Sequence, residues 1–230
     1  MDISKRLQMI ANCVPTNTDT VADIGTDHGY IPIYLIKNNI AKRCLACDIN
    51  PMPLSSAQKN INYYDMQAQI ETRLGSGLSK VSPNEVDIVM IAGMGGMLII
   101  DILREDLEVV KDIGLLILQP QLDVGPLRKY IHAIDFSIID EKMLCEDGKY
   151  YTIITAKPGK ETNYSHEEYL LGKKLIQSKN PVLKDFLNYK INSFNLLIHN
   201  LSSKNTTEAQ KRLEEVKKEC NTYKEVLKCL

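Results

Sequence analysis

The stretch that decides the fold is Val21-Ala22-Asp23-Ile24-Gly25-Thr26-Asp27-His28-Gly29-Tyr30. Its pattern predicts a buried strand that ends in a glycine-rich turn and continues into a helix. In such a unit the glycines let the backbone approach a ligand, and the first N–H groups of the helix have no partner inside the helix. The stretch therefore predicts a nucleotide-binding turn.

Two acids distinguish this turn from a dinucleotide-binding loop. Asp23 lies within the stretch, and Asp27 occupies the position where such a loop has its second glycine. A carboxylate there would repel a pyrophosphate at short range, which disfavours a ligand of the NAD type. A cationic, nucleoside-like ligand suits the turn better.

Apolar runs alternate with amphipathic segments over residues 1–160. Strands are expected at residues 21–24, 44–47, 70–74, 86–92, 115–118, 136–139 and 151–156, with helices between most of them. This alternation predicts an α/β, Rossmann-like sheet with right-handed crossovers, closed by an antiparallel hairpin. A further helix over residues 4–14 is expected to pack on the sheet edge or to cover the ligand pocket.

The periodicity changes after residue 160. Ser165 opens a capping box and a helix that is expected to end near Asn180, and a second capping box is expected at Thr207. The two helices beyond Asn180 carry apolar residues at alternating steps of three and four, which predicts an antiparallel coiled-coil hairpin. We therefore expect a ligand-binding domain over residues 1–160 and an all-α domain over residues 161–230.

The chain is nearly neutral, but its charge is unevenly distributed. It holds 28 Lys and Arg against 29 Asp and Glu, a net charge of −1; residues 1–160 hold 16 and 20, and residues 161–230 hold 12 and 9. The C-terminal domain is thus the better candidate for a nucleic-acid surface, with a solvated helix face as the alternative. The candidate RNA contacts in this domain are Lys173, Lys190 and Arg212.

Composition also limits the class of protein. No stretch approaches the ~20 apolar residues of a membrane span, and the N-terminus lacks the apolar core of a signal peptide, so we expect a cytoplasmic protein without a membrane partner. Cys44 and Cys47 form a C-x-x-C, but side chains three apart in a strand point to opposite faces. We expect small core residues and no metal, with a metal or redox site as the alternative.

Three signals on successive strands together indicate S-adenosylmethionine rather than NAD. They are the acid-rich turn; Asp48, which ends the second strand and can accept hydrogen bonds from both ribose hydroxyls; and Gly75-Ser76-Gly77, whose backbone can lie against an adenine ring. The expected cofactor-binding residues are Asp23, Gly25, Asp27, Gly29, Asp48, Ile49, Gly75, Ser76, Gly77, Ala92 and Gly93.

Several motifs resemble those of the bacterial tRNA adenine N1-methyltransferases that modify position 22. They are Ala22-Asp23-Ile24-Gly25-Thr26-Asp27-His28, Ala92-Gly93-Met94-Gly95-Gly96, Leu118-Gln119-Pro120 and Glu146-Asp147-Gly148-Lys149. The resemblance covers essentially the full length. It implies a class I methyltransferase sheet followed by a coiled-coil domain, acting on tRNA and converting S-adenosylmethionine to S-adenosylhomocysteine. One departure is Gln121, which stands where the family usually has Asn.

The implied reaction requires few catalytic side chains. Adenine N1 carries a lone pair and needs no deprotonation before it attacks, so catalysis is mainly positioning. The product ring is cationic, and Asp27 is our candidate to stabilise that charge and accept the later proton. The alternative is that Asp27 contacts the methionine ammonium. His28, the second catalytic candidate, either contacts the target base or serves as a cap or packing residue.

The fourth strand ends without the Asn/Asp-Pro-Pro-aromatic motif that grips an exocyclic amino group. Its glycines either form a flat floor for an extruded base or make a tight turn with close helix packing. The expected substrate contacts in this region are Met94, Gly95, Gln119 and Gln121.

Two other functions stay open at this stage. The protein could be a non-catalytic RNA-binding module with a vestigial cofactor site. It could also methylate a small molecule or a protein, with the hairpin serving dimerisation; otherwise we expect a monomer.

Overall fold

The computed structural model describes residues 2–204 and 206–230. It divides into two compact units, Met1–Asn163 and Tyr164–Leu230. The division falls just after the boundary expected at residue 160. Tyr164 belongs to the second unit because its buried ring packs near Tyr169 and lies beneath the Lys173 ammonium, 4.6 Å from the ring centre.

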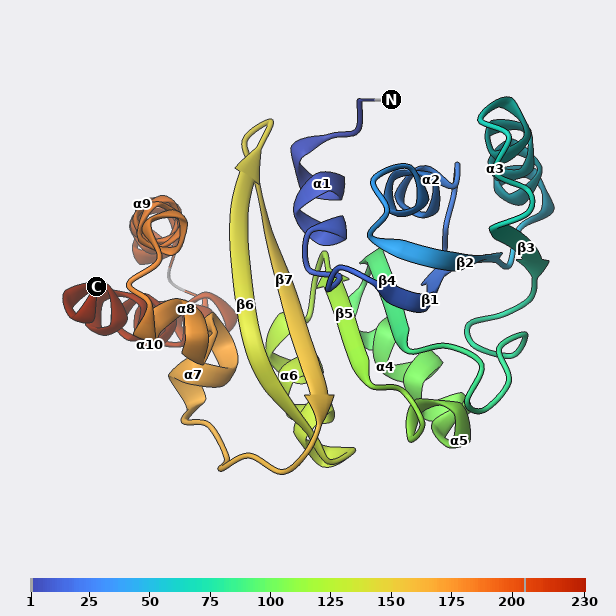
Figure 1. Ribbon diagram of the computed structural model, residues 1–230. Helices are drawn as coiled ribbons and strands as arrows, with labels where there is room; N and C mark the ends of the chain where they lie inside the picture. The colour runs from blue at the N-terminus through green and yellow to red at the C-terminus, as the bar shows by residue number, and fades with distance from the viewer. Residues whose placement is uncertain (1, 205) are drawn as a thin grey trace. The chain divides into compact units, whose positions relative to one another are not determined.

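Within the described residues, the first unit contains a seven-stranded sheet in the order β3-β2-β1-β4-β5-β7-β6 (Figure 1). The strands are β1 Thr18–Ile24, β2 Ala41–Asp48, β3 Ile70–Leu74, β4 Ile88–Met94, β5 Leu115–Pro120, β6 Phe136–Glu146 and β7 Lys149–Pro158. The first five pair in parallel, and β7 runs antiparallel to both β5 and β6. The predicted α/β fold with its closing hairpin is confirmed.

Helices cover both faces of this sheet. Figure 1 shows α1, α2 and α3 on one face and α4, α5 and α6 on the other. Their bounds are α1 Lys5–Ala11, α2 Tyr30–Lys37, α3 Pro51–Tyr63, α4 Gly96–Glu105, α5 Leu107–Val110 and α6 Val124–Ala133. Ser4 caps α1 by accepting a hydrogen bond from the Leu7 N–H, as its sequence position indicated. The short helix α5 was not predicted.

Strand β6 is much longer than the predicted segment 136–139. The prediction ended early because residues 140–142 are polar, and a polar run usually marks a loop. In the structure the Glu141 carboxylate is buried and accepts a 2.7 Å hydrogen bond from Arg128 Nε of α6. This buried ion pair lets a charged residue remain on the covered face of β6, the edge strand of the sheet.

The middle of the sheet is the core of the first unit. Val21 and Ala22 of β1 and residues 88–91 of β4 are all buried, as expected for strands covered on both faces. Cys44 and Cys47 are buried free thiols of β2. They pack as small core residues.

The second unit begins with two short helices, α7 His166–Leu171 and α8 Lys173–Gln177. The capping box at Ser165 is present. The single helix predicted to run to about Asn180 was wrong, because Gly172 adopts a φ of +98° and ends α7. This left-handed region suits glycine and breaks the helix.

The last two helices form the predicted hairpin, α9 Pro181–Ser202 and α10 Thr207–Cys229. The cap of α10 is Thr206, one residue before the position we predicted, and it accepts a hydrogen bond from the Ala209 N–H. Tyr223 of α10 packs against Phe194 of α9 with ring centres 5.2 Å apart. Buried residues follow the predicted pattern of threes and fours in both helices, namely Leu183, Leu187, Ile191, Phe194, Ala209, Val216, Cys220 and Tyr223. None of the described helices combines the length and apolar character that a membrane crossing requires.

Candidate functional site

The turn after β1 is held against the end of β2. The N–H groups of Gly25 and Thr26 both donate to the Cys47 carbonyl, at 2.8 and 3.0 Å. Gly25 has a φ of +77°, and a Cβ added to it would lie 2.2 Å from Cε of Met94. The positive φ therefore favours glycine at position 25, and any larger residue would also displace the end of the Met94 side chain.

Asp48 joins the loops that follow the first three strands. Its carboxylate accepts hydrogen bonds from the N–H groups of Asp27, at 3.3 Å, and Asn50, at 2.8 Å. Its backbone carbonyl accepts a third from the Gly75 N–H, at 3.0 Å. An ionised carboxylate has about four lone-pair sites, so Asp48 keeps acceptor capacity for a ligand.

A cavity of about 420 Å³, here called the Asp48 cavity, lies at this edge of the sheet. It contains most of the residues predicted to bind the cofactor, together with Met94 from the predicted substrate set. Its lining is Ile24, Gly25, Asp27, Asp48, Ile49, Asn50, Pro53, Gly75, Ser76, Gly77, Ala92, Gly93, Met94, Leu98 and Ile102. The sequence analysis missed the apolar wall of Pro53, Leu98 and Ile102.

A second cavity, of about 310 Å³, is called the His28 cavity. It shares Gly25, Asp27, Ala92 and Gly93 with the first, so the two adjoin at the turn. Its lining is Arg6, Leu7, Asp23, Gly25, Thr26, Asp27, His28, Tyr30, Ile31, Ala92, Gly93 and Gln121. Helix α1 therefore contributes Arg6 and Leu7 to this cavity. This agrees with one of the two positions expected for the helix, over the ligand pocket.

Asp23 is a buried acid in the wall of the His28 cavity, with 4% of its surface exposed. Burial raises its pKa to about 7, and the negative charge of Asp48 adds to the shift, while the Thr26 hydroxyl opposes it. Thr26 Oγ1 is itself buried and has no partner of regular hydrogen-bond geometry among the described residues. The Asp23 carboxyl group and the Thr26 hydroxyl together form a polar site suited to a cationic group.

Asp27, His28 and Tyr30 form a cluster at the mouth of the same cavity. His28 Nε2 lies 3.5 Å from Asp27 Oδ1, and the rings of His28 and Tyr30 stack with centres 5.3 Å apart. The N-cap of α2 is Gly29, so His28 does not cap the helix. Gly29 lines neither cavity, and Tyr30 is a candidate that the sequence analysis had treated only as the first residue of the helix.

The glycines after β4 serve different purposes. Gly93 has a φ of +78°, and β4 contains a bulge between Ala92 and Met94 that turns Met94 across Gly25. A Cβ on Gly96 would lie 2.5 Å from the Asp123 carbonyl oxygen, so close packing requires this glycine. Gly95 has open space around it and lines neither cavity.

Gln119 holds another side chain in place. Its amide is fully buried; Oε1 accepts a 2.8 Å hydrogen bond from Arg6 Nη1, and Nε2 donates to the Pro120 carbonyl. Gln119 lines neither cavity, whereas Arg6 does, with its guanidinium 5.4 Å above the Tyr151 ring. Among the described residues that line the two cavities, Arg6 is the only lysine or arginine.

Gln121 remains part of the site although it departs from the family pattern. Its side chain lines the His28 cavity, and its N–H donates to the Met94 carbonyl at 2.8 Å. This bond joins the ends of β4 and β5 beside Gly93.

The predicted RNA contacts all lie in the second unit, where each already has an interaction. Lys173 and Lys190 lie over the rings of Tyr164 and Phe194, and Arg212 pairs with Glu215 at 2.9 Å. Across residues 2–204 and 206–230, no group of three or more His, Cys, Asp or Glu side chains could hold a metal ion.

Comparison with known proteins agrees with this geometry. Residues 3–154 match a family model described as a methyltransferase domain. The chain is 32% identical to the tRNA (adenine(22)-N(1))-methyltransferase of Bacillus subtilis over 99% of its own length and 98% of the relative.

The chain belongs to this methyltransferase family. Its fold matches Streptococcus pneumoniae Sp1610 in complex with S-adenosyl-L-methionine, with a TM-score of 0.88 and 30% identity over 98% of this chain and 100% of the other. It also matches M. capricolum TrmK bound to S-adenosyl-homocysteine, with a TM-score of 0.86 and 31% identity over 99% and 98% of the two chains. The family resemblance found in the sequence is confirmed.

The raised pKa of Asp23 predicts a pH-dependent stability of this methyltransferase without ligand. Between about pH 4 and pH 7 the unfolded state releases the Asp23 proton, whose ordinary pKa is 3.8, while the folded state keeps it up to a pKa of about 7. Asp23 therefore makes the fold less stable as the pH rises through this window, by at most about 1.4 kcal/mol per pH unit.

Asp23→Asn removes this titration. The free energy of unfolding of the variant, relative to wild type, should increase from pH 5 to pH 7 and level off by pH 8, as measured by urea unfolding at each pH. A difference that does not change with pH would contradict the assignment.

Proposed function

We propose that this methyltransferase transfers the methyl group of S-adenosylmethionine to N1 of adenosine 22 in tRNA. The observation that carries the proposal is that Asp48, the Gly25 turn and residues 75–77 line one cavity at the carboxyl ends of the parallel strands. A relative that shares nearly the full length is a tRNA (adenine(22)-N(1))-methyltransferase, which supports the substrate.

The residues of the two cavities fit the cofactor part by part. Asp48 offers carboxylate oxygens for the ribose hydroxyls, and residues 75–77 with Ile49 offer backbone and an apolar side chain for the adenine. Asp23 and Thr26 offer a carboxylate and a hydroxyl for the methionine ammonium. Arg6 supplies a cation for the methionine carboxylate, since Gln119 occupies only its Nη1.

S-adenosylmethionine, when bound, supplies a methyl group on a positively charged sulfur. The protein then has to hold the adenine N1 in line with that methyl group and exclude water. The Watson–Crick edge must be free, so the base is extruded from the tRNA. We propose that it enters beside Gly93, Met94 and Gln121, with the stacked rings of His28 and Tyr30 as an aromatic wall.

We propose that Asp27 responds to the charge on the accepting base. Its exposed carboxylate lies at the turn shared by the two cavities and 3.5 Å from His28. Because the buried Asp23 already provides a carboxylate for the ammonium, Asp27 is available to stabilise the cationic product ring and to accept its proton.

The second unit is proposed to bind the tRNA backbone through Lys173, Lys190 and Arg212. Its heptad positions pack α9 on α10 within one chain, which supports a monomer. A role on tRNA also supports a cytoplasmic location.

The direct test of the proposal uses labelled S-adenosylmethionine and two transcripts of one tRNA, with A or G at position 22. Label should enter the A22 transcript alone and appear as 1-methyladenosine after digestion to nucleosides. Label in another nucleoside, or equal labelling of the two transcripts, would contradict the proposal.

The proposed role of Asp27 predicts that Asp27→Asn lowers kcat by about 10²-fold to 10³-fold, because the amide cannot accept the proton. KM for S-adenosylmethionine should change little, as measured by initial rates at saturating tRNA. A variant with unchanged kcat and a raised cofactor KM would instead assign Asp27 to the methionine ammonium.

A further inference from the structure

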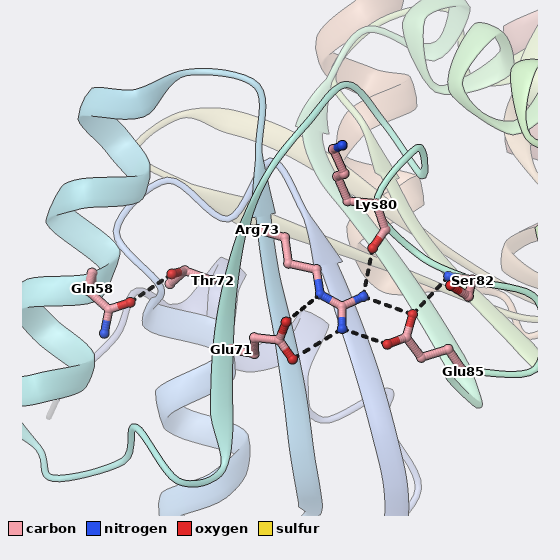
Figure 2. A network of polar contacts seen from close by, with 7 residues as sticks. All are labelled: Gln58, Glu71, Thr72, Arg73, Lys80, Ser82 and Glu85. Carbon is pink, nitrogen blue, oxygen red and sulfur yellow. Dashed lines mark hydrogen bonds and ion pairs between the residues drawn. The ribbon is translucent and has the colours of Figure 1, made fainter.

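Arg73, near the end of β3, is the centre of a polar network outside the two cavities (Figure 2). Its guanidinium donates to Glu71 through Nε and Nη2 at 2.8 and 3.1 Å, and to Glu85 through Nη1 and Nη2 at 2.8 and 2.6 Å. Nη1 also donates to the Lys80 carbonyl at 2.6 Å. These contacts use all five N–H donors of the guanidinium.

The network fixes the loop that follows β3. This loop starts with Gly75-Ser76-Gly77, which lines the Asp48 cavity, and then folds back so that Lys80 and Glu85 reach Arg73. A Cβ on Gly75 would lie 2.3 Å from Cγ of Lys80, so the part of the loop that Arg73 holds packs directly against the part that lines the cavity.

Glu85 is the side chain that joins the loop to the strand, beside the backbone carbonyl of Lys80. Its side chain is 28% exposed, and it also accepts a 2.8 Å hydrogen bond from the Ser82 N–H. The Arg73 guanidinium and this N–H lower the pKa of Glu85 to about 2, so the link is ionised at neutral pH. Glu71, by contrast, lies on β3 itself, two residues from Arg73, and is 51% exposed.

The strand has an independent anchor on its other side. Thr72 Oγ1 donates a 2.7 Å hydrogen bond to Gln58 Oε1 of α3 (Figure 2). Loss of the Arg73–Glu85 pair therefore leaves β3 attached to its neighbours through its ladder with β2 and through α3. The segment that loses support is the loop, which then keeps only the Lys80 carbonyl on Arg73.

We propose that Arg73 is a positioning residue for the cofactor, which acts through Glu85 and the Lys80 carbonyl to hold residues 75–77 in their binding geometry. The inference rests on the proposed function. It predicts that breaking the link weakens S-adenosylmethionine binding and leaves the methyl transfer from the bound cofactor unchanged.

A matched pair of variants tests this inference, Glu85→Gln and Glu71→Gln. Each makes the same chemical change on the same guanidinium, but only Glu85 connects to the loop. The Kd of S-adenosylhomocysteine, measured by calorimetry, should rise about tenfold in Glu85→Gln, equal to about 1.4 kcal/mol, and less than about twofold in Glu71→Gln. In both variants kcat at saturating cofactor and KM for tRNA should stay at wild-type values.

Hydrogen exchange distinguishes a local change in the loop from a change in the overall stability of the protein. The backbone amides of residues 75–81 should exchange faster in Glu85→Gln than in Glu71→Gln, with the other strands unchanged. Equal effects of the two variants on Kd, or a fall in Tm without a change in Kd, would overturn the inference and leave an ordinary stabilising ion pair.

If Glu85→Gln does not fold, a third variant, Arg73→Lys, tests the same inference. Arg73→Lys keeps the charge but loses the planar fork that binds two carboxylates and a carbonyl together. It should raise the Kd of S-adenosylhomocysteine without changing KM for tRNA, and an unchanged Kd would overturn the inference. If wild-type protein binds neither S-adenosylmethionine nor S-adenosylhomocysteine, the proposed function fails; if it binds them, the variants test the positioning role alone.

Discussion

The carboxylate of Asp48 is the constraint on which the functional edge of the sheet depends. A parallel sheet brings the carboxyl ends of its strands to one edge, but the loops beyond those ends need fixed positions to form a site. Asp48 accepts N–H groups from Asp27 and Asn50, and its carbonyl accepts the Gly75 N–H. One residue therefore holds the three loops that line the cavity, while keeping oxygen lone pairs for a ligand.

The same edge concentrates negative charge in a partly buried place. Burial and the charge of Asp48 raise the pKa of Asp23 to about 7, and Asp27 lies in the same turn. Such an arrangement is unfavourable without a cation nearby, so a ligand with ammonium and sulfonium groups relieves it and a pyrophosphate does not. Arg6, held by Gln119, is the one lysine or arginine among the described residues that line the two cavities, and it lines the same cavity as Asp23 and Asp27.

Local patterns predicted those parts of the fold that local physics determines. The predicted bounds of β3, residues 70–74, matched the structure, and most of the predicted cofactor residues line one cavity because successive parallel strands end at one edge. The missed features depend on contacts between distant residues. Arg6 meets Gln119 across 113 positions, and β6 continues through Glu141 because Arg128 neutralises it. Neither partner can be identified from periodicity or spacing.

A crystal structure of the protein with S-adenosylhomocysteine tests most directly whether Asp48 binds the ribose of the cofactor. We predict that both ribose hydroxyls lie within hydrogen-bond distance, about 2.5–3.0 Å, of the Asp48 carboxylate, with the adenine against residues 75–77. A ribose bound elsewhere, with no contact to Asp48, would contradict the account.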